Sequence, residues 1–240
     1  MRGLLVAIGL LTRIPVPIGH IGQEGQWPRT AVWFPLVGLL IGALVVSALT
    51  LAQHQASQLA ALLGVLVWVG ITGGLHLDGA ADLADALGSA HRDPERFHAV
   101  MKDPHVGSFA IMAILFIVLI KLQALAMMVG EDGRMLALVL IPAWARLAAV
   151  FWSQVLPPIA PGMGERFSSG MGKAGLVGWL ILLALASVAA GFSVLVWVAL
   201  LTMSGWWVFL RSRVGGFSGD CMGAGIEWME CLLLLAMVFS

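Results

Sequence analysis

Three aspartates with helical spacing are the residues of this sequence best suited to chemistry. Asp78, Asp82 and Asp85 lie in the segment TGGLHLDGAADLADALGSA. In a helix running from Asp78 onward, offsets of four and seven residues place the three carboxylates within an arc of about 60°. Such carboxylates repel one another unless a cation lies among them, and ligands that are all oxygen suit Mg²⁺ or Mn²⁺ better than Zn²⁺. The spacing predicts a Mg²⁺ site or, alternatively, a solvated helix start whose acidic residues complement the helix dipole.

A second polar segment, RSRVGGFSGDCMGAGIEWME, begins at Arg211 and leads into the last apolar stretch. Arg211 and Arg213 supply positive charge for a phosphate, and Asp220 could add a metal ligand. Glu227 and Glu230 are expected on one helical face that starts at the membrane surface. The glycines that would let backbone amides approach a ligand are Gly215, Gly216, Gly219, Gly223 and Gly225. Alone this segment could be a plain connector, but beside the acidic segment it could help to hold a pyrophosphate during displacement.

Two basic residues fall inside apolar stretches, where an unpaired charge is costly. Arg146 is near the middle of its stretch and is expected to face the bundle interior or a wet cavity. Its partner is expected to be a phosphate or carboxylate of the site or, alternatively, a structural partner on another helix. Lys121 is nearer the end of its stretch, from which its side chain could reach the membrane boundary, so it is left out of the site.

The elements that must position these residues are membrane spans. Of 240 residues, 60% are hydrophobic and 11% charged, against about 45–50% and about 25% in soluble domains. Several apolar stretches are near or above the roughly 18–20 residues that cross a bilayer core of about 30 Å. The expected spans are residues 31–52, 58–77, 107–129, 135–156, 174–191, 193–210 and 226–239. The sequence predicts an all-α, polytopic helical bundle of about seven spans, forming a single catalytic domain over residues 1–240, with a re-entrant or interfacial helix at residues 3–11.

The basic residues outside the expected spans gather on one side of the membrane. The other side receives only Arg134. Because cytoplasmic loops carry the excess of Lys and Arg, the rich side is predicted to be cytoplasmic. Most acidic residues also lie there, which indicates cytoplasmic chemistry or, alternatively, only longer loops. The residues on the rich side are Arg2, Arg13, Arg29, Arg92, Arg96, Lys102, Arg166, Lys173, Arg211 and Arg213. The net charge is zero, so nothing in the balance recruits nucleic acid.

Along nearly its whole length the chain resembles the cobalamin synthase family, the adenosylcobinamide-GDP ribazoletransferases of the bacterial inner membrane. The likeness lies in the order and spacing of five segments: LTRIPVP, FPLVGLLIG, TGGLHLDGAADLADALG, MKDPHVGSFA and GGFSGDCMGAGIEWME. It implies Mg²⁺-dependent transfer of the cobinamide phosphate from adenosylcobinamide-GDP to α-ribazole or its 5′-phosphate, the nucleotide-loop assembly step of cobalamin biosynthesis. The products would be adenosylcobalamin, or its 5′-phosphate, and GMP.

The resemblance also implies residue roles. The family's H-x-D-G-x-x-D-x-x-D motif falls on His76, Asp78, Gly79, Asp82 and Asp85, and its K/R-D pair on Lys102 and Asp103. Its glycine-rich loop falls on Gly215, Gly216, Ser218, Gly219 and Asp220, and its E-x-x-E on Glu227 and Glu230. Ala80 and Leu83 stand where leucine and threonine are common, so any role of a threonine hydroxyl is absent here. The segment PGMGERFSSG keeps the family's glycines and Phe167.

The mechanism expected from these residues is an in-line displacement at a metal-bound pyrophosphate. Asp78, Asp82 and Asp85, with Asp220, would hold one or two Mg²⁺ ions. Lys102, Arg146 and Arg213 would offset the charge that develops as the bond to GMP breaks. The 3′-hydroxyl of α-ribazole would attack, and Asp103 or a metal-site aspartate would take its proton.

Two rival functions are weaker. A CDP-alcohol phosphotransferase requires D-x₂-D-G-x₂-A-R, but Leu75 stands at its first aspartate. A cation-coupled transporter favours acids near the bilayer midplane, whereas these lie at span ends. Association into a homo-oligomer or with other enzymes of the pathway is left open.

Overall fold

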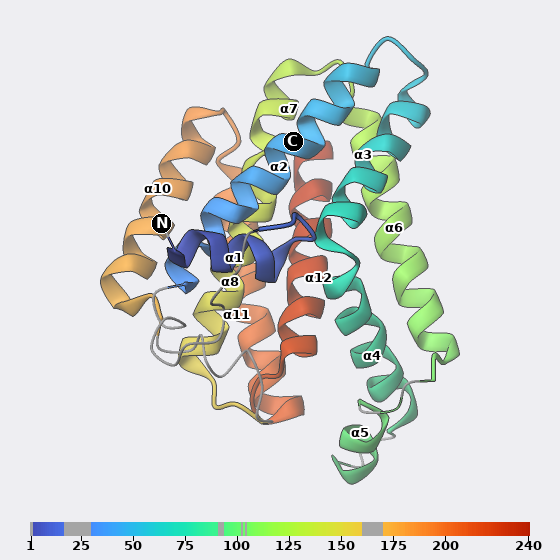
Figure 1. Ribbon diagram of the computed structural model, residues 1–240, viewed down its shortest axis with the longest axis vertical. Helices are drawn as coiled ribbons and strands as arrows, with labels where there is room; N and C mark the ends of the chain where they lie inside the picture. The colour runs from blue at the N-terminus through green and yellow to red at the C-terminus, as the bar shows by residue number, and fades with distance from the viewer. Residues whose placement is uncertain (1, 17–29, 91–93, 102, 104, 160–169) are drawn as a thin grey trace.

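The computed structural model describes residues 2–16, 30–90, 94–101, 103, 105–159 and 170–240 (Figure 1). Within these ranges the chain is helical and no strand is present, which confirms the predicted all-α class. Six helical segments of the described chain are long and apolar enough to cross a membrane, and a bent helix pair brings the number to as many as seven. The six segments are Ala31–Ala52, Ser108–Met128, Gly133–Val155, Gly172–Ala189, Val194–Val214 and Gly219–Val238.

The helix labels of Figure 1 follow chain order. The longer helices are α2 (Phe34–Ala52), α3 (Ser57–Thr72), α4 (Leu75–Ser89), α6 (Ser108–Met128), α8 (Leu140–Val155), α10 (Gly172–Ala189), α11 (Val194–Phe209) and α12 (Gly219–Val238). The shorter ones are α1 (Arg2–Leu11), the 3-10 turn η2 (Ala31–Trp33), α5 (Pro94–Val100), α7 (Asp132–Leu138) and the π-helical turn η3 (Leu210–Val214). Helix α1 crosses in front of the long helices, in the region expected to form a short re-entrant or interfacial helix (Figure 1).

The second expected span is broken. Helix α3 ends at Thr72, and α4 leaves it at an angle of 87°. Gly73 and Gly74 make this turn with φ values of 65° and 70°, which glycine adopts at no steric cost. The backbone N–H of Arg13 donates to the Ile71 carbonyl over 2.6 Å, so the N-terminal segment satisfies one of the carbonyls that the helix end leaves open. The acidic helix therefore begins at Leu75, before Asp78.

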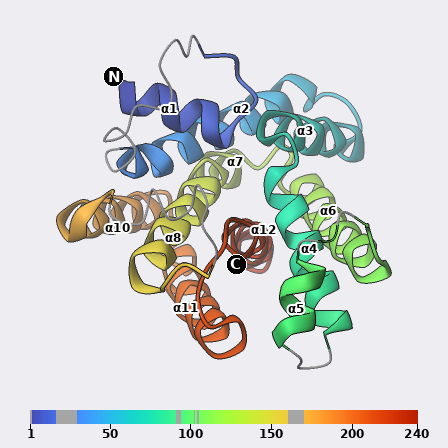
Figure 2. The same cartoon turned by 60° about the horizontal axis from the view of Figure 1, so that its bottom comes forward.

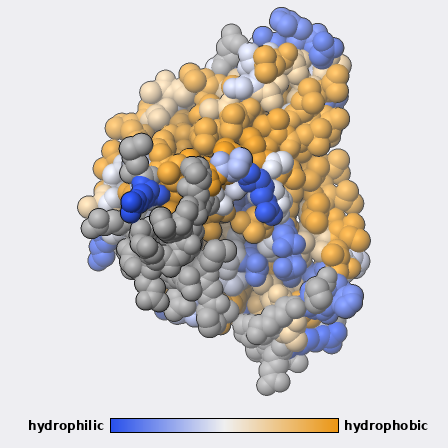
Figure 3. All heavy atoms as spheres, in the orientation of Figure 1, coloured by the Kyte–Doolittle hydropathy of each residue, from blue (hydrophilic) through white to orange (hydrophobic). Residues whose placement is uncertain are grey.

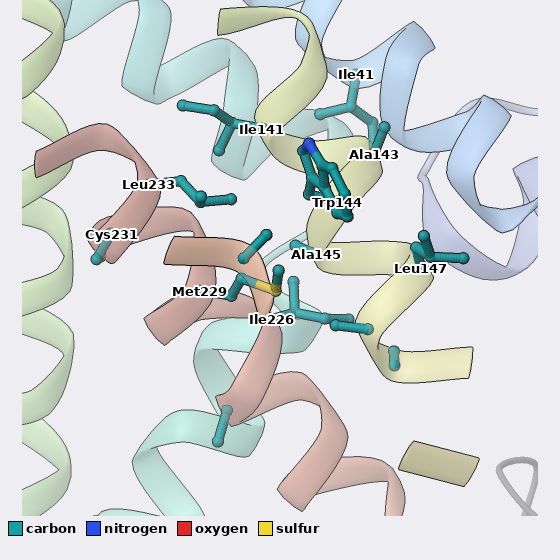
Figure 4. Close-up of a cluster of buried hydrophobic side chains, with 14 of the residues drawn as sticks. Ile41, Ile141, Ala143, Trp144, Ala145, Leu147, Ile226, Met229, Cys231 and Leu233 are labelled. Atoms are coloured by element: carbon teal, nitrogen blue, oxygen red, sulfur yellow. The ribbon is translucent and has the colours of Figure 1, made fainter. Parts of the chain in front are cut away.

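Helix α12 is the central helix of the bundle. It packs against α4, α6, α8 and α11, which surround it in the end-on view (Figure 2). Between α8 and α12 lies an apolar core that includes Trp144, Ile226 and Met229, and Ile41 of α2 adjoins it (Figure 4). Helix α2 in turn packs closely on α8, because a Cβ on Gly38 would lie 2.5 Å from the Ala143 Cα. Gly38 thus provides a small-residue contact of the kind by which membrane helices approach.

On the face that Figure 3 shows, the described surface has a broad apolar band, with hydrophilic residues toward both ends. Helix α7, which contains Arg134, lies at the end opposite to α5 (Figure 1). Two expected boundaries differ from the structure. The last span begins at Gly219 rather than near residue 226, so Gly223 and Gly225 lie within α12 and not in a loop. Arg211 and Arg213 belong to the helical end of the preceding span.

Candidate active site

The acidic helix α4 lies directly against the N-terminal half of α12. A Cβ on Gly79 would lie 2.7 Å from the Asp220 carbonyl oxygen and 2.8 Å from its Cα. About one turn further along α12, a Cβ on Gly223 would lie 3.3 Å from the His76 Cα. The two glycines therefore allow the backbones to touch, and this contact brings the two acidic segments of the sequence together.

Four carboxylates lie close enough along this crossing to interact electrostatically. Asp78, Asp85 and Asp220 each repel the Asp82 carboxylate electrostatically, and Asp78 also repels Asp220. Asp78 is exposed, while Asp82 and Asp220 are partly buried. No ion pair to Asp78, Asp82 or Asp220 occurs within the described part of the chain. We name Asp78, Asp82 and Asp220 the carboxylate cluster; its negative charge is not offset by any described cation.

Asp85, which the sequence analysis groups with these aspartates, has a different environment. It is buried, and its two oxygens accept hydrogen bonds from the backbone N–H groups of Gly107 (2.6 Å) and Ala110 (2.9 Å). Gly107 is the N-cap position of α6, so Asp85 caps that helix from a neighbouring one. A Cβ on Gly107 would lie 2.6 Å from Asp85 Oδ1, so a larger residue there would displace the Asp85 carboxylate. The position of Asp85 thus ties α4 to the start of α6.

Deeper in the bundle, four charged side chains form a fully buried network. Lys121 Nζ donates to Glu227 Oε2 over 2.7 Å and to Glu230 Oε2 over 2.5 Å. Arg146 Nη1 donates to Glu230 Oε1, and Arg146 Nη2 lies 3.4 Å from His76 Nδ1. All five residues are at most 4% exposed. We name Lys121, Arg146, Glu227 and Glu230 the buried ion network; two cations and two carboxylates make it electrically balanced.

The environments of these four residues differ in part from those predicted from the sequence. Glu227 and Glu230 are buried rather than at the membrane surface, because α12 begins about two turns before Glu227. Arg146 faces the bundle interior as expected, with a carboxylate of another helix as its partner. Lys121 does not reach toward the membrane boundary, since its side chain is 2% exposed and bound to both glutamates. The E-x-x-E spacing, together with a lone lysine in another apolar helix, was the signal that could have revealed this pairing.

The segment before α12 shapes the helix N-terminus beside the carboxylate cluster. Ser218 is the N-cap, and its hydroxyl accepts from the Cys221 backbone N–H over 3.2 Å. Gly215 adopts φ 82°, and Gly216 packs so closely that a Cβ there would overlap the Pro157 carbonyl oxygen. No described residue lies within 4 Å of a Cβ on Gly219. Among the described residues, the first position of α12 is thus next to open space.

Of the three basic positions predicted for the site, the structure describes Arg211 and Arg213. Arg213 is exposed at the end of the η3 turn, as is Arg211, whose guanidinium carbon lies 5.6 Å from the centre of the Trp207 ring. Lys102 and the PGMGERFSSG segment up to Ser169 lie outside the described residues.

Asp103 is exposed and is held by its neighbour His105. The backbone N–H of His105 donates to Asp103 Oδ1 over 3.0 Å, and the His105 ring Nδ1 lies 2.6 Å from the same oxygen. The hydrogen bond from the backbone, followed by that from the ring, holds the pKa of Asp103 below its usual range. A carboxylate with a lowered pKa is a weaker proton acceptor, which argues against Asp103 as the general base.

The donor set of the carboxylate cluster fits Mg²⁺. Its ligands are all carboxylate oxygens, and their repulsion favours a cation among them. Among the described residues, no three His, Cys, Asp or Glu side chains are already arranged as a metal cage. Mg²⁺ usually takes only one or two protein carboxylates and fills its other positions with water and substrate phosphate. Asp82, with Asp78 or Asp220, is sufficient for that kind of site.

The fold and site define a class of protein. It is a polytopic helical membrane protein in which carboxylates and the N-terminus of one helix lie together where α4 and α12 cross. The model of the Cobalamin-5-phosphate synthase family matches residues 3–238. The chain therefore belongs to that family.

Curated relatives agree with the family match over the whole chain. The adenosylcobinamide-GDP ribazoletransferase of Thiobacillus denitrificans is 47% identical over 240 residues, covering 98% of this chain and 94% of the relative. The protein of the same name from Laribacter hongkongensis is 47% identical, covering 99% and 97%. That from Novosphingobium aromaticivorans is 44% identical, covering 100% and 97%. No solved structure matches the chain.

Proposed function

We propose that this protein is an adenosylcobinamide-GDP ribazoletransferase. It joins adenosylcobinamide-GDP to α-ribazole, or to α-ribazole 5′-phosphate, and releases GMP. The identity of 44–47% to three transferases of this name, over nearly the full length of each chain, supports the reaction. The observation that carries the site is the contact between Gly79 and Asp220, because it joins the two acidic segments.

The reaction is a phosphoryl transfer. The 3′-hydroxyl oxygen of α-ribazole forms a bond to the phosphorus next to cobinamide, the bond from that phosphorus to the GMP oxygen breaks, and GMP leaves with the bonding electrons. The proton of the hydroxyl passes to a carboxylate. Asp82 suits this role better than Asp103, because Asp82 lies at the crossing while the pKa of Asp103 is lowered.

The carboxylate cluster would hold Mg²⁺. Asp78, Asp82 and Asp220 supply the oxygen ligands, and the ion, when bound, neutralises charge on the pyrophosphate. Asp85 is not assigned as a ligand, because its two oxygens accept hydrogen bonds from α6. It would help to hold α4, and with it Asp78 and Asp82, in position.

Phosphate groups of the substrate would lie at the N-terminus of α12. The helix dipole and the first N–H groups favour an anion there, and Gly219 leaves space for it. Arg213, exposed in the turn that precedes α12, supplies positive charge, and a similar role for Lys102 stays a prediction. Arg146 is bound to Glu230 and fully buried, so it is assigned to the buried ion network instead.

We place the site on the cytoplasmic face of the bacterial inner membrane. The exposed Arg211, Arg213 and Lys173 lie at helix ends on the side expected to be cytoplasmic by the excess of basic residues. Both substrates are polar molecules, which need access from water rather than from lipid.

The test is a reconstituted reaction. The purified protein in detergent is given adenosylcobinamide-GDP, α-ribazole and Mg²⁺, and GMP is measured over time. Release that requires both α-ribazole and Mg²⁺ supports the proposal. Release of GMP without α-ribazole would identify a hydrolase, and solute uptake by proteoliposomes without GMP release would identify a transporter; either result would overturn it.

A further inference from the structure

Lys121 is a buried charged residue that the proposed reaction does not use. It is the only charged residue of α6, and its side chain is 2% exposed. Its Nζ lies 4.4 Å from the centre of the Trp68 ring on α3, in addition to its bonds to Glu227 and Glu230. Lys121 therefore connects three helices at one point.

The part of Lys121 in neutralising the buried glutamates can be separated from that of Arg146. Glu230 is shared by both cations, whereas Glu227 forms its ion pair with Lys121 alone among the described residues. Without Lys121, the Glu227 carboxylate would be buried with no cation bound to it. A single carboxylate in that state is strongly unfavourable, so α12 would have to move or Glu227 would have to take up a proton.

Helix α12 carries residues of both the buried ion network and the carboxylate cluster, and α4 contacts both groups. Helix α12 holds Glu227 and Glu230 and, about two turns before Glu227, Asp220. Helix α4 holds His76, which contacts Arg146, and the aspartates that follow it. The backbones touch at Gly79 and Gly223, so a shift of α12 cannot be absorbed by side chains and must move Asp220 relative to α4.

We propose that Lys121 is a positioning residue for the transferase: by neutralising Glu227 it keeps α12 in place against α4, so that Asp220 stays beside Asp78 and Asp82. This inference rests on the proposed function, since it assigns the carboxylate cluster to metal binding. Lys121 itself contacts neither the substrate nor the carboxylate cluster. Its effect passes through α12.

The experiment uses binding of Mn²⁺ alone, measured by electron paramagnetic resonance on the purified full-length chain, together with GMP release and thermal unfolding. Four variants are compared with the parent protein: Lys121→Met, Glu227→Gln, the double variant, and Lys173→Met. Lys173 is an exposed lysine near the start of α10 and serves as the matched control. The double variant removes one cation and one carboxylate, which leaves Arg146 paired with Glu230.

We expect Lys121→Met to weaken Mn²⁺ binding by about tenfold, the scale on which supporting residues around a metal site act. The double variant should recover most of that loss and of the accompanying loss in GMP release, while Lys173→Met leaves both unchanged. Recovery is informative even if Lys121→Met alone does not fold, because the balanced double variant has no unpaired buried charge.

Two results would overturn the inference. One is a double variant that binds Mn²⁺ as weakly as Lys121→Met or more weakly. The other is a Lys121→Met protein with a lower unfolding temperature but unchanged Mn²⁺ affinity, which would make Lys121 purely structural. Failure of the proposed function looks different: the parent protein would release no GMP in the presence of α-ribazole, whatever the Mn²⁺ series shows.

Discussion

The buried ion network and the carboxylate cluster share helix α12 and use their carboxylates in opposite ways. In the buried ion network, Lys121 and Arg146 neutralise Glu227 and Glu230 away from solvent. In the carboxylate cluster, Asp78, Asp82 and Asp220 are nearer to solvent and repel one another. Charges that the chain balances by itself stabilise the fold. Charges left unbalanced at an accessible crossing are the ones available to an external cation.

The largest effect should come from the buried ion network. Glu230→Gln removes the carboxylate that binds both Lys121 and Arg146, and we expect it to cost about 3–5 kcal/mol in the free energy of unfolding, since charges are left uncompensated. Thermal unfolding in detergent measures this. Glu131→Gln, at an exposed glutamate, is the control. Equal stability of the two variants would contradict the role of Glu230.

Substitutions in the carboxylate cluster should reduce activity without reducing stability. Asp82→Asn is expected to lower Mg²⁺-dependent GMP release by at least about 100-fold, the scale of a lost electrostatic contact in a transition state. Its unfolding temperature without metal should be the same or higher, because repulsion from Asp78 and Asp220 is relieved. An Asp82→Asn protein with normal activity would exclude Asp82 from the site.

The close contact that joins α4 to α12 can be tested with one methyl group. Gly79→Ala places a Cβ where the Asp220 backbone lies, and overpacking of this kind costs about 1–3 kcal/mol. GMP release should fall more than the folded fraction does. Gly178→Ala, in the interior of α10 with nothing within 4 Å of its Cβ, is the control and should not be destabilised. Full activity of Gly79→Ala would show that the crossing tolerates movement.

Asp85 shares features of both groups, because it is buried like the buried ion network and lies on α4 with Asp78 and Asp82. Asp85→Asn weakens the cap of α6, which we expect to cost about 0.5–2 kcal/mol. Hydrogen exchange of the Gly107 and Ala110 amides should become faster, and Mn²⁺ binding should weaken less than in Asp82→Asn. A loss of Mn²⁺ affinity equal to that of Asp82→Asn would instead make Asp85 a direct metal ligand.

The smallest effect is expected at Asp103. Because the His105 N–H lowers the pKa of Asp103, any stabilisation from its charge is present above the unfolded-state pKa and is lost only as the pH falls through the lower folded-state value. Asp103 therefore stays ionised at neutral and mildly acidic pH. Asp103→Asn should leave the acidic limb of the pH–rate profile of GMP release in place. A shift of that limb would return Asp103 to the role of general base.

The number of spans and the location of the aspartates on one helix could be predicted from the sequence, because hydropathy and helical spacing are local properties. The break at Gly73 and Gly74 could not, since the apolar residues continue across it and mask the turn. Partners distant in the chain were also missed. Lys121 meets glutamates more than a hundred positions later, and Asp85 meets amides of another helix. Such contacts depend on which helices pack together, and spacing within one segment carries no information about that.

The hydrogen bond from Arg13 to Ile71 bears on how the chain enters the membrane. The carbonyl at the end of α3 receives its donor from a segment that is synthesised well before α3 itself. In an apolar environment an open backbone carbonyl is expensive, so the turn between α3 and α4 depends on the N-terminal segment. Removal of residues 2–13 is expected to leave the Ile71 carbonyl without this donor and to impair the second membrane crossing.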